Sequence, residues 1–145
     1  MRATYRIVAM LIALGVVVQA AVIAAAWFQV IKDTDAGVVF DKNAEGNWGH
    51  AAHGIIGMMV IPVLAILLLI VAFFAGIPGG VKWAAITFGV VALQVLLAFG
   101  GFDLAAVGAL HGINAFAVAG VASVAMRKAR LASAEPVPAE PAPVA

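Results

Sequence analysis

The chain has 145 residues, of which 66% are hydrophobic and 10% charged, and its formal net charge is +1. Soluble domains are about half apolar and about a quarter charged, so this composition excludes an ordinary soluble protein and favours an integral membrane protein. The small net charge gives no indication of a nucleic-acid partner, and without cysteine the chain has neither disulfides nor thiolate ligands.

Four apolar stretches are long enough to cross the hydrocarbon core of a bilayer, which takes about 20 residues of helix. None of them keeps a polar face for water. The first is longer than the apolar region of a signal peptide, so we expect it to stay as a membrane helix. The sequence therefore predicts an all-α four-helix membrane bundle over residues 1–130. Its helices are expected at residues 5–31, 48–74, 81–100 and 104–126.

Basic residues gather at the two ends of this bundle region and in the link between its second and third helices. The positive-inside rule then predicts a multi-pass plasma-membrane protein with both termini in the cytoplasm. Residues 131–145, rich in proline and alanine, are expected to form a disordered cytoplasmic tail. The basic residues that carry this prediction are Arg2, Arg6, Lys82, Arg127, Lys128 and Arg130.

The first predicted helix carries one polar side chain, Gln19, near its middle. An amide without a partner is costly in hydrocarbon, so Gln19 is expected to face the bundle interior. The favoured interpretation is a hydrogen bond to another helix. The alternative is contact with the polar edge of a cofactor.

The second predicted helix begins G-H-A-A-H-G-I-I-G, with His50 and His53 one turn apart on one face. This spacing suits zinc, but two ligands do not make a closed tetrahedral site. Gly57 lies one turn deeper than His53 on the same face, where bare backbone would let a flat macrocycle approach. Pro62 is expected to kink the helix or remove one backbone hydrogen bond.

The third and fourth predicted helices form a hairpin. Gln94 lies inside the third helix, and the pair Gly100-Gly101 predicts a tight turn after it. His111 lies about two turns into the fourth helix, at a depth similar to that of His53, and Ala115 follows it one turn below.

The two halves of the chain resemble each other. G-V-V-V-Q in the first helix aligns with G-V-V-A-L-Q in the third, and H-G-I-I-G-M-M-V aligns with H-G-I-N-A-F-A-V. Each half thus reads as a helix with a glutamine followed by a helix with a His-Gly pair. A tandem repeat of two helix hairpins would place His53 and His111 on opposite sides of one axis at the same depth.

Two interior histidines at one depth favour a b-type heme held between the second and fourth helices, with His53 and His111 as its iron ligands. The other nitrogen of each ring then needs an acceptor. His50 is expected near the heme propionates or loop water, or as a ligand in place of His53. Histidines that only pack, or that hold another metal or a proton, remain open alternatives. The residues expected to make room for the ring or to be its polar neighbours are Gly54, Gly57, Gly112, Ala115, Gln19, Gln94 and Asn114.

The motif L-Q-V-L-L-A at residues 93–98, followed by Leu110-His111-Gly112, resembles the helix hairpin of the heme A synthase family. The resemblance implies a four-helix bundle with one b heme near its outer face, His53 and His111 as ligands, and Gln94 as the glutamine of the third helix. It does not extend to synthase activity, because the chain has length for only one of that family's two bundles. Synthase activity is also disfavoured because residues 5–31 contain no acidic residue and the chain contains no cysteine pair.

The chain also resembles small four-helix membrane proteins of actinobacterial type without an assigned function. The expected function is a membrane heme protein that transfers electrons or handles heme, with quinone or a membrane redox protein as its partner. Catalysis is not expected. The alternative is a cofactor-free accessory or assembly subunit in which the histidines serve packing.

Overall fold

The computed structural model describes residues 1–134, which form helices and the links between them. Four helices are long and apolar enough to cross a membrane, and one of them is built from three segments. This confirms the all-α, four-helix membrane class. The elements are α1 (Arg2–Asp35), α2 (Trp48–Ile55), the π-helical turn η1 (Ile56–Val60), α3 (Ile61–Ala75), α4 (Gly80–Asp103) and α5 (Ala105–Ala134).

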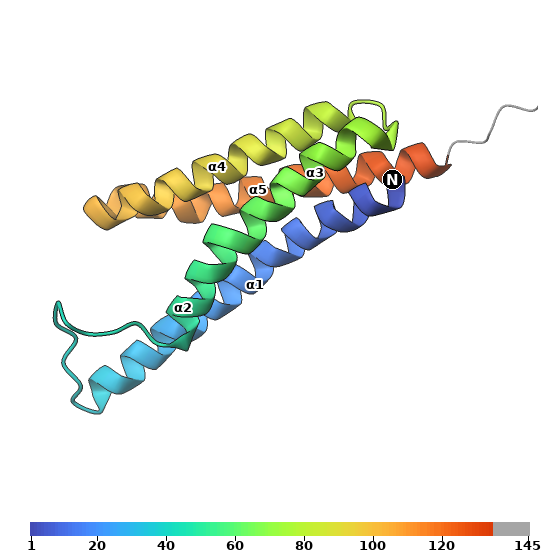
Figure 1. Ribbon diagram of the computed structural model, residues 1–145. Helices are drawn as coiled ribbons and strands as arrows, with labels where there is room; N and C mark the ends of the chain where they lie inside the picture. Colours follow the sequence, from blue (N-terminus) through green and yellow to red (C-terminus); the bar gives the residue numbers. More distant parts are fainter. Residues whose placement is uncertain (135–145) are drawn as a thin grey trace, which may run out of the picture.

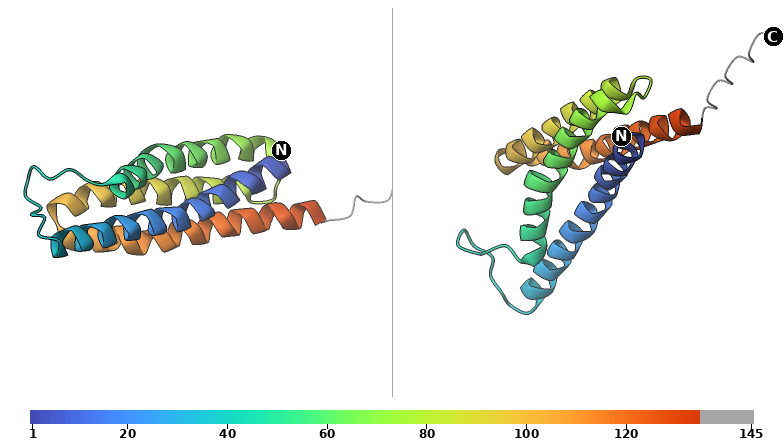
Figure 2. Two further views of the ribbon diagram at one scale, coloured as in Figure 1. Left: turned by 90° about the horizontal axis from the view of Figure 1, so that it is seen from below. Right: turned by 45° about the vertical axis from the view of Figure 1, so that its right-hand side comes forward.

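The helices form two hairpins that diverge from one end of the molecule. One hairpin is α1 with the continuous span α2–η1–α3, and the other is α4 with α5 (Figure 1). The hairpins lie close together at the end that holds the N-terminus and spread apart toward the opposite end (Figure 2). We call these the closed end and the open end.

Nearly all buried side chains lie toward the closed end. Small residues let the four helices approach closely there, which is how packing replaces the hydrophobic effect inside a bilayer. Toward the open end only Ala26 and Gly49 are buried. The core residues are Tyr5, Val8, Ala9, Ile12, Ile61, Ala65, Leu68, Val71, Ala72, Ala75, Ile77, Ala84, Val91, Val118, Ala122, Ala125, Ala129 and Ala132.

Polar side chains of α1 fasten the closed end. The Arg2 guanidinium donates to the carbonyls of Ala75, Gly76 and Ala132, which occupies acceptors at the ends of α3 and α5. The buried Tyr5 hydroxyl donates to the carbonyl of Gly80 at the start of α4, at 2.9 Å. The four helices are therefore joined at this end by bonds as well as by packing.

The link between α3 and α4 is the turn that its glycines predict. Gly76 (φ +57°) ends α3 and Gly79 (φ +72°) precedes α4, both in the left-handed region. Residues with a side chain rarely adopt this conformation. The chain therefore reverses direction within a few residues.

The predicted turn at Gly100-Gly101 is wrong. Helix α4 continues through both glycines to Asp103, and the chain reverses at Leu104. A Cβ on Gly100 would lie 2.8 Å from the Val107 side chain, and one on Gly101 would lie 2.9 Å from the Gly108 backbone. These glycines allow α4 and α5 to touch, as small residues do in membrane helix pairs.

The predicted boundary between the last helix and the tail also shifts. Helix α5 continues to Ala134, so its last turn covers the first residues of the predicted tail, which was expected from residue 131. The rest of the predicted tail, residues 135–145, lies outside the described residues.

The predicted effect of Pro62 appears just before it. Pro62 is the second residue of α3, and the π-helical turn Ile56–Val60 precedes it. Proline has no N–H to donate, so the carbonyl one turn earlier loses its usual helical hydrogen bond. A wider turn is one known way for a helix to absorb this loss. It lies one turn beyond His53.

Candidate cofactor-binding site between two histidines

A cavity of about 390 Å³ opens between the two hairpins beyond the end of the core. This volume falls within the range of about 300–1,000 Å³ found for ligand sites. Its lining comes from α1, α2, η1, α3, α4 and α5. It includes eight of the ten predicted site residues: Gln19, His53, Gly54, Gly57, Gln94, His111, Gly112 and Ala115.

His53 and His111 face each other across this cavity. Their ring centres are 6.2 Å apart and their planes cross at 60°. A metal held by two imidazole nitrogens at about 2 Å each would separate ring centres by roughly 6 Å, since each nitrogen lies about 1.1 Å from its ring centre. The separation of the ring centres is therefore compatible with a metal between the two rings.

The Nδ1 atom of each histidine bonds to a backbone carbonyl of the neighbouring helix. His53 Nδ1 lies 3.2 Å from the Gln19 oxygen, and His111 Nδ1 lies 2.9 Å from the Gln94 oxygen. Because a carbonyl only accepts, each Nδ1 carries the hydrogen. In a neutral imidazole the Nε2 atom is then the one with the free lone pair. Metal-binding histidines have this arrangement.

Each glutamine side chain in turn donates a hydrogen bond to the backbone of the histidine. The Gln19 amide donates to the His53 carbonyl at 2.9 Å, and the Gln94 amide donates to the His111 carbonyl at 3.0 Å. Each hairpin thus contains the same reciprocal Gln–His pair, in keeping with the repeat of a Gln helix and a His-Gly helix in the two halves. The pairs fix the helix register that turns both imidazoles inward.

The two pairs differ in one respect. The Gln94 amide also lies 3.1 Å from His111 Nε2, and its own oxygen accepts from Asn114 at 2.7 Å. The side-chain oxygen Oε1 of Gln19 is buried without a partner in the described part of the chain. His111 Nε2 therefore already has a donor, which a metal would have to displace.

The glycines after the histidines leave open space. A Cβ on Gly54 or Gly112 would meet no atom within 4 Å, and both residues line the cavity. Gly57 also lines it, but a Cβ there would lie 2.5 Å from the Gln19 amide nitrogen. Gly54 and Gly112 thus leave room for a ligand, while Gly57 makes room for Gln19.

Two predicted site residues lie outside the cavity lining. The His50 ring meets Trp27 edge-on with ring centres 5.5 Å apart, and its buried Nδ1 has no partner among residues 1–134. Asn114 donates to the Val90 carbonyl and to the Gln94 oxygen. His50 is therefore not placed to replace His53 as a ligand. Asn114 lies outside the cavity lining and holds the Gln94 side chain in position.

Sequence reasoning missed Asn47, which positions the helix of His53. Its side-chain oxygen accepts from the Gly49 and His50 N–H groups, which caps α2, and its amide donates to the Ala26 carbonyl at 2.9 Å. An asparagine just before an apolar helix is a recognisable capping signal. Sequence reasoning also missed large apolar residues of the cavity lining: Met58, Phe99, Phe102 and Phe116.

These residues fit a heme better than a bare metal ion. Within residues 1–134 no group of three or more histidine, cysteine, aspartate or glutamate side chains is placed to hold a metal. Two imidazoles alone do not complete a tetrahedral or octahedral site. A macrocycle that brings its own metal and equatorial nitrogens needs only two axial ligands and an apolar slot.

The comparisons with known proteins leave the activity open. Residues 39–101 are similar to a family described as "Family of unknown function (DUF6220)". This match covers His53 and Gln94 and ends before His111. No curated protein and no solved structure matches the chain.

Proposed function

We propose that this chain is a membrane b-type heme protein that transfers electrons or handles heme, with His53 and His111 as the axial ligands. The observation that carries the proposal is the 6.2 Å separation of two inward-facing imidazoles across an apolar cavity. When bound, a bis-histidine heme supplies one-electron redox chemistry.

The chain's own residues would contribute orientation and a dry environment. The Gln19 and Gln94 backbone carbonyls hold each Nδ1 hydrogen, which leaves the lone pair of each imidazole on Nε2. Gly54 and Gly112 leave backbone exposed where a ring would lie flat. The Gln94 amide must release His111 Nε2 when a ligand enters.

A second candidate is a cofactor-free accessory or assembly subunit. The hydrogen bond between the Gln94 amide and His111 Nε2 favours it, because both nitrogens of that ring are then satisfied by the protein. In this case the reciprocal Gln–His pairs serve packing alone. The two candidates predict different visible spectra.

The deciding experiment is an absorption spectrum of the detergent-purified protein, oxidised and then reduced with dithionite. We expect a sharp Soret band and resolved α and β bands on reduction, as in a six-coordinate low-spin heme. His53→Ala and His111→Ala should each lose this spectrum. His50→Ala is the matched control and should keep it, because His50 lies outside the cavity.

A featureless spectrum that persists after hemin is added would reject the heme proposal and favour the cofactor-free subunit. Normal heme content in both the His53→Ala and the His111→Ala proteins would reject the ligand assignment.

We further propose a plasma-membrane location with the closed end in the cytoplasm. Arg2, Arg6, Lys82 and the basic residues of α5 lie at the closed end, whereas the acidic residues of the described chain lie near the open end. The histidine cavity would then lie toward the outer face, within reach of quinone or a membrane redox protein in the bilayer.

A further inference from the structure

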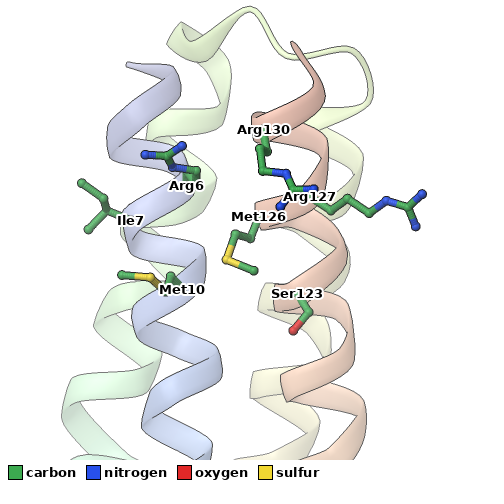
Figure 3. Close-up of a pocket in the computed structure, with 7 residues that line it drawn as sticks. All are labelled: Arg6, Ile7, Met10, Ser123, Met126, Arg127 and Arg130. Carbon is green, nitrogen blue, oxygen red and sulfur yellow. The ribbon is translucent and has the colours of Figure 1, made fainter. Parts of the chain in front are cut away.

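A second cavity, of about 480 Å³, lies between α1 and α5 at the closed end. We call it the arginine groove; its lining residues are Arg6, Ile7, Met10, Ser123, Met126, Arg127 and Arg130. Figure 3 shows Met126 between the two helices, with Arg6 and Met10 on α1, and with Arg130 and Arg127 on α5, where the Arg127 side chain extends to the side away from α1. The groove is remote from the histidine cavity and shares no lining residue with it.

The arginines of this groove fit the positive-inside rule, but no hydrogen bond to another helix holds them in place within residues 1–134. Arg2, a turn away, is fully engaged with backbone carbonyls. Arg6, Arg127 and Arg130 are exposed, and within residues 1–134 they make no comparable hydrogen bond or ion pair. Three arginines thus line one groove without an ion pair in the described part of the chain.

The nearest described carboxylates lie at the other end of the molecule. They belong to the last turn of α1, to the loop 36–47, and to Asp103 at the end of α4. The charges of residues 1–134 near the groove are therefore positive, which favours a negatively charged ligand.

The floor of the groove determines which anion fits. Ile7, Met10 and Met126 are apolar and belong to helices that cross the membrane. A free anion would gain nothing from this floor, whereas an acyl chain would lie along it. Guanidinium groups bind phosphate by paired hydrogen bonds, and their long stems reach from apolar surroundings to the headgroup level.

We propose that the arginine groove binds one anionic phospholipid, with its phosphate held by Arg6, Arg127 and Arg130 and one acyl chain against Met10 and Met126. Basic pockets between membrane helices are known to hold anionic headgroups in this way. This site does not depend on the heme proposal.

The test is native mass spectrometry of the whole protein in a neutral detergent. Phosphatidylglycerol and phosphatidylcholine with the same acyl chains are added separately, and the fraction of protein that retains one lipid is measured. We expect preferential retention of phosphatidylglycerol. One basic residue is worth about 1 kcal/mol near such a headgroup, so each of Arg6→Gln, Arg127→Gln and Arg130→Gln should weaken retention about fivefold.

Lys82→Gln and Lys128→Gln are the matched controls. They remove the same charge at the same end of the molecule, but neither lysine lines the groove. Retention should be unchanged in both. An equal loss in the lysine and arginine variants would show a diffuse charge effect and overturn the proposal.

Two further arms distinguish other occupants. If inorganic phosphate at the same concentration displaces the lipid, the groove is a site for free anions and the lipid assignment is wrong. If phosphatidylglycerol is retained only by a chain that ends at Ala134, then residues 135–145, which include Glu135 and Glu140, occupy the groove instead. Equal retention of both lipids also overturns the proposal.

Discussion

Each inward-facing histidine is held by a glutamine on the neighbouring helix through two bonds that run in opposite directions. The imidazole donates to the glutamine backbone, and the glutamine side chain donates to the histidine backbone. Hydrogen bonds between membrane helices contribute only about 0.6 kcal/mol on average. Four such bonds add modest stability, so their main effect is to fix ring orientation.

The polar residues of the second hairpin form a longer chain than those of the first. Asn114 holds the Gln94 oxygen, and Gln94 in turn reaches both His111 Nε2 and the His111 carbonyl. At Gln19 the equivalent oxygen has no partner among the described residues. A buried acceptor without a donor costs about 1–3 kcal/mol, which a donor on a bound ligand or an ordered water would relieve.

Filling the space beside His111 should abolish ligand binding without unfolding the protein. Gly112→Leu and Gly54→Leu each place a side chain in open space at the cavity, where a Cβ meets no atom within 4 Å. Helix propensity favours the change by about 0.8 kcal/mol. We expect at least tenfold lower heme content, measured by the Soret absorbance per protein, with an unchanged or raised melting temperature.

Gly89→Leu and Gly120→Leu control for this prediction. Both glycines also have no atom within 4 Å of an added Cβ, but neither lines the cavity. They should keep full heme content. Loss of heme in these proteins would mean that bulk on any helix surface disturbs binding.

At the scale of the elements, the cap of α2 joins the loop to the site. Asn47 closes the first turn of α2 and also ties it to α1 through the Ala26 carbonyl. Gly49 lets the helices touch here, since a Cβ would lie 2.7 Å from the Val22 oxygen. The first turn of the helix that carries His53 thus depends on one side chain.

Asn47→Ala should therefore loosen the open end. Loss of an N-cap costs about 0.5–2 kcal/mol, and loss of the bond to Ala26 adds to it. We expect faster hydrogen exchange at the amides of α2 and a lower melting temperature. Asn43→Ala is the control, because Asn43 bonds only to Asp41 in the exposed loop. Equal effects of the two changes would contradict the role of the cap.

The hydropathy of the chain was sufficient to predict the four membrane helices, and the Gln and His-Gly patterns were sufficient to predict the polar and glycine residues of the cavity lining but not its large apolar residues. The turn at Gly100-Gly101 was mispredicted because glycine both breaks helices and allows close helix contact. Only the opposing residues Val107 and Gly108 distinguish the two uses. The His-Gly pair distinguished His53 from His50, but the contact of His50 with Trp27 could not be predicted because it follows from the packing of α1 against α2.

At the scale of the whole molecule, the absence of cysteine allows the orientation to be tested directly. Ala44→Cys places one thiol in the loop 36–47, and Ala3→Cys places one at the other end of α1. With a membrane-impermeant maleimide on intact cells, we expect labelling of the first variant and labelling of the second only after lysis. The reverse pattern would invert the proposed topology and place the histidine cavity toward the cytoplasm.

The core is distributed unevenly between the two ends of the bundle. Buried residues join the four helices at the closed end, whereas the open end is held by a few polar bonds around a cavity. A ligand in that cavity would supply packing contacts between the helices at the open end. Binding to the folded state alone adds about 2.7 kcal/mol when the ligand is present at 100 times its dissociation constant.

This gain should slow hydrogen exchange at the open end by up to about 100-fold. The affected amides are expected in α2 and the first turns of α5, with little change near Leu68 and Ala125, which are fully buried without any ligand. Hydrogen-exchange mass spectrometry with and without hemin measures the difference. Equal protection at both ends would show that hemin acts on the bundle generally, and no protection would favour the cofactor-free subunit.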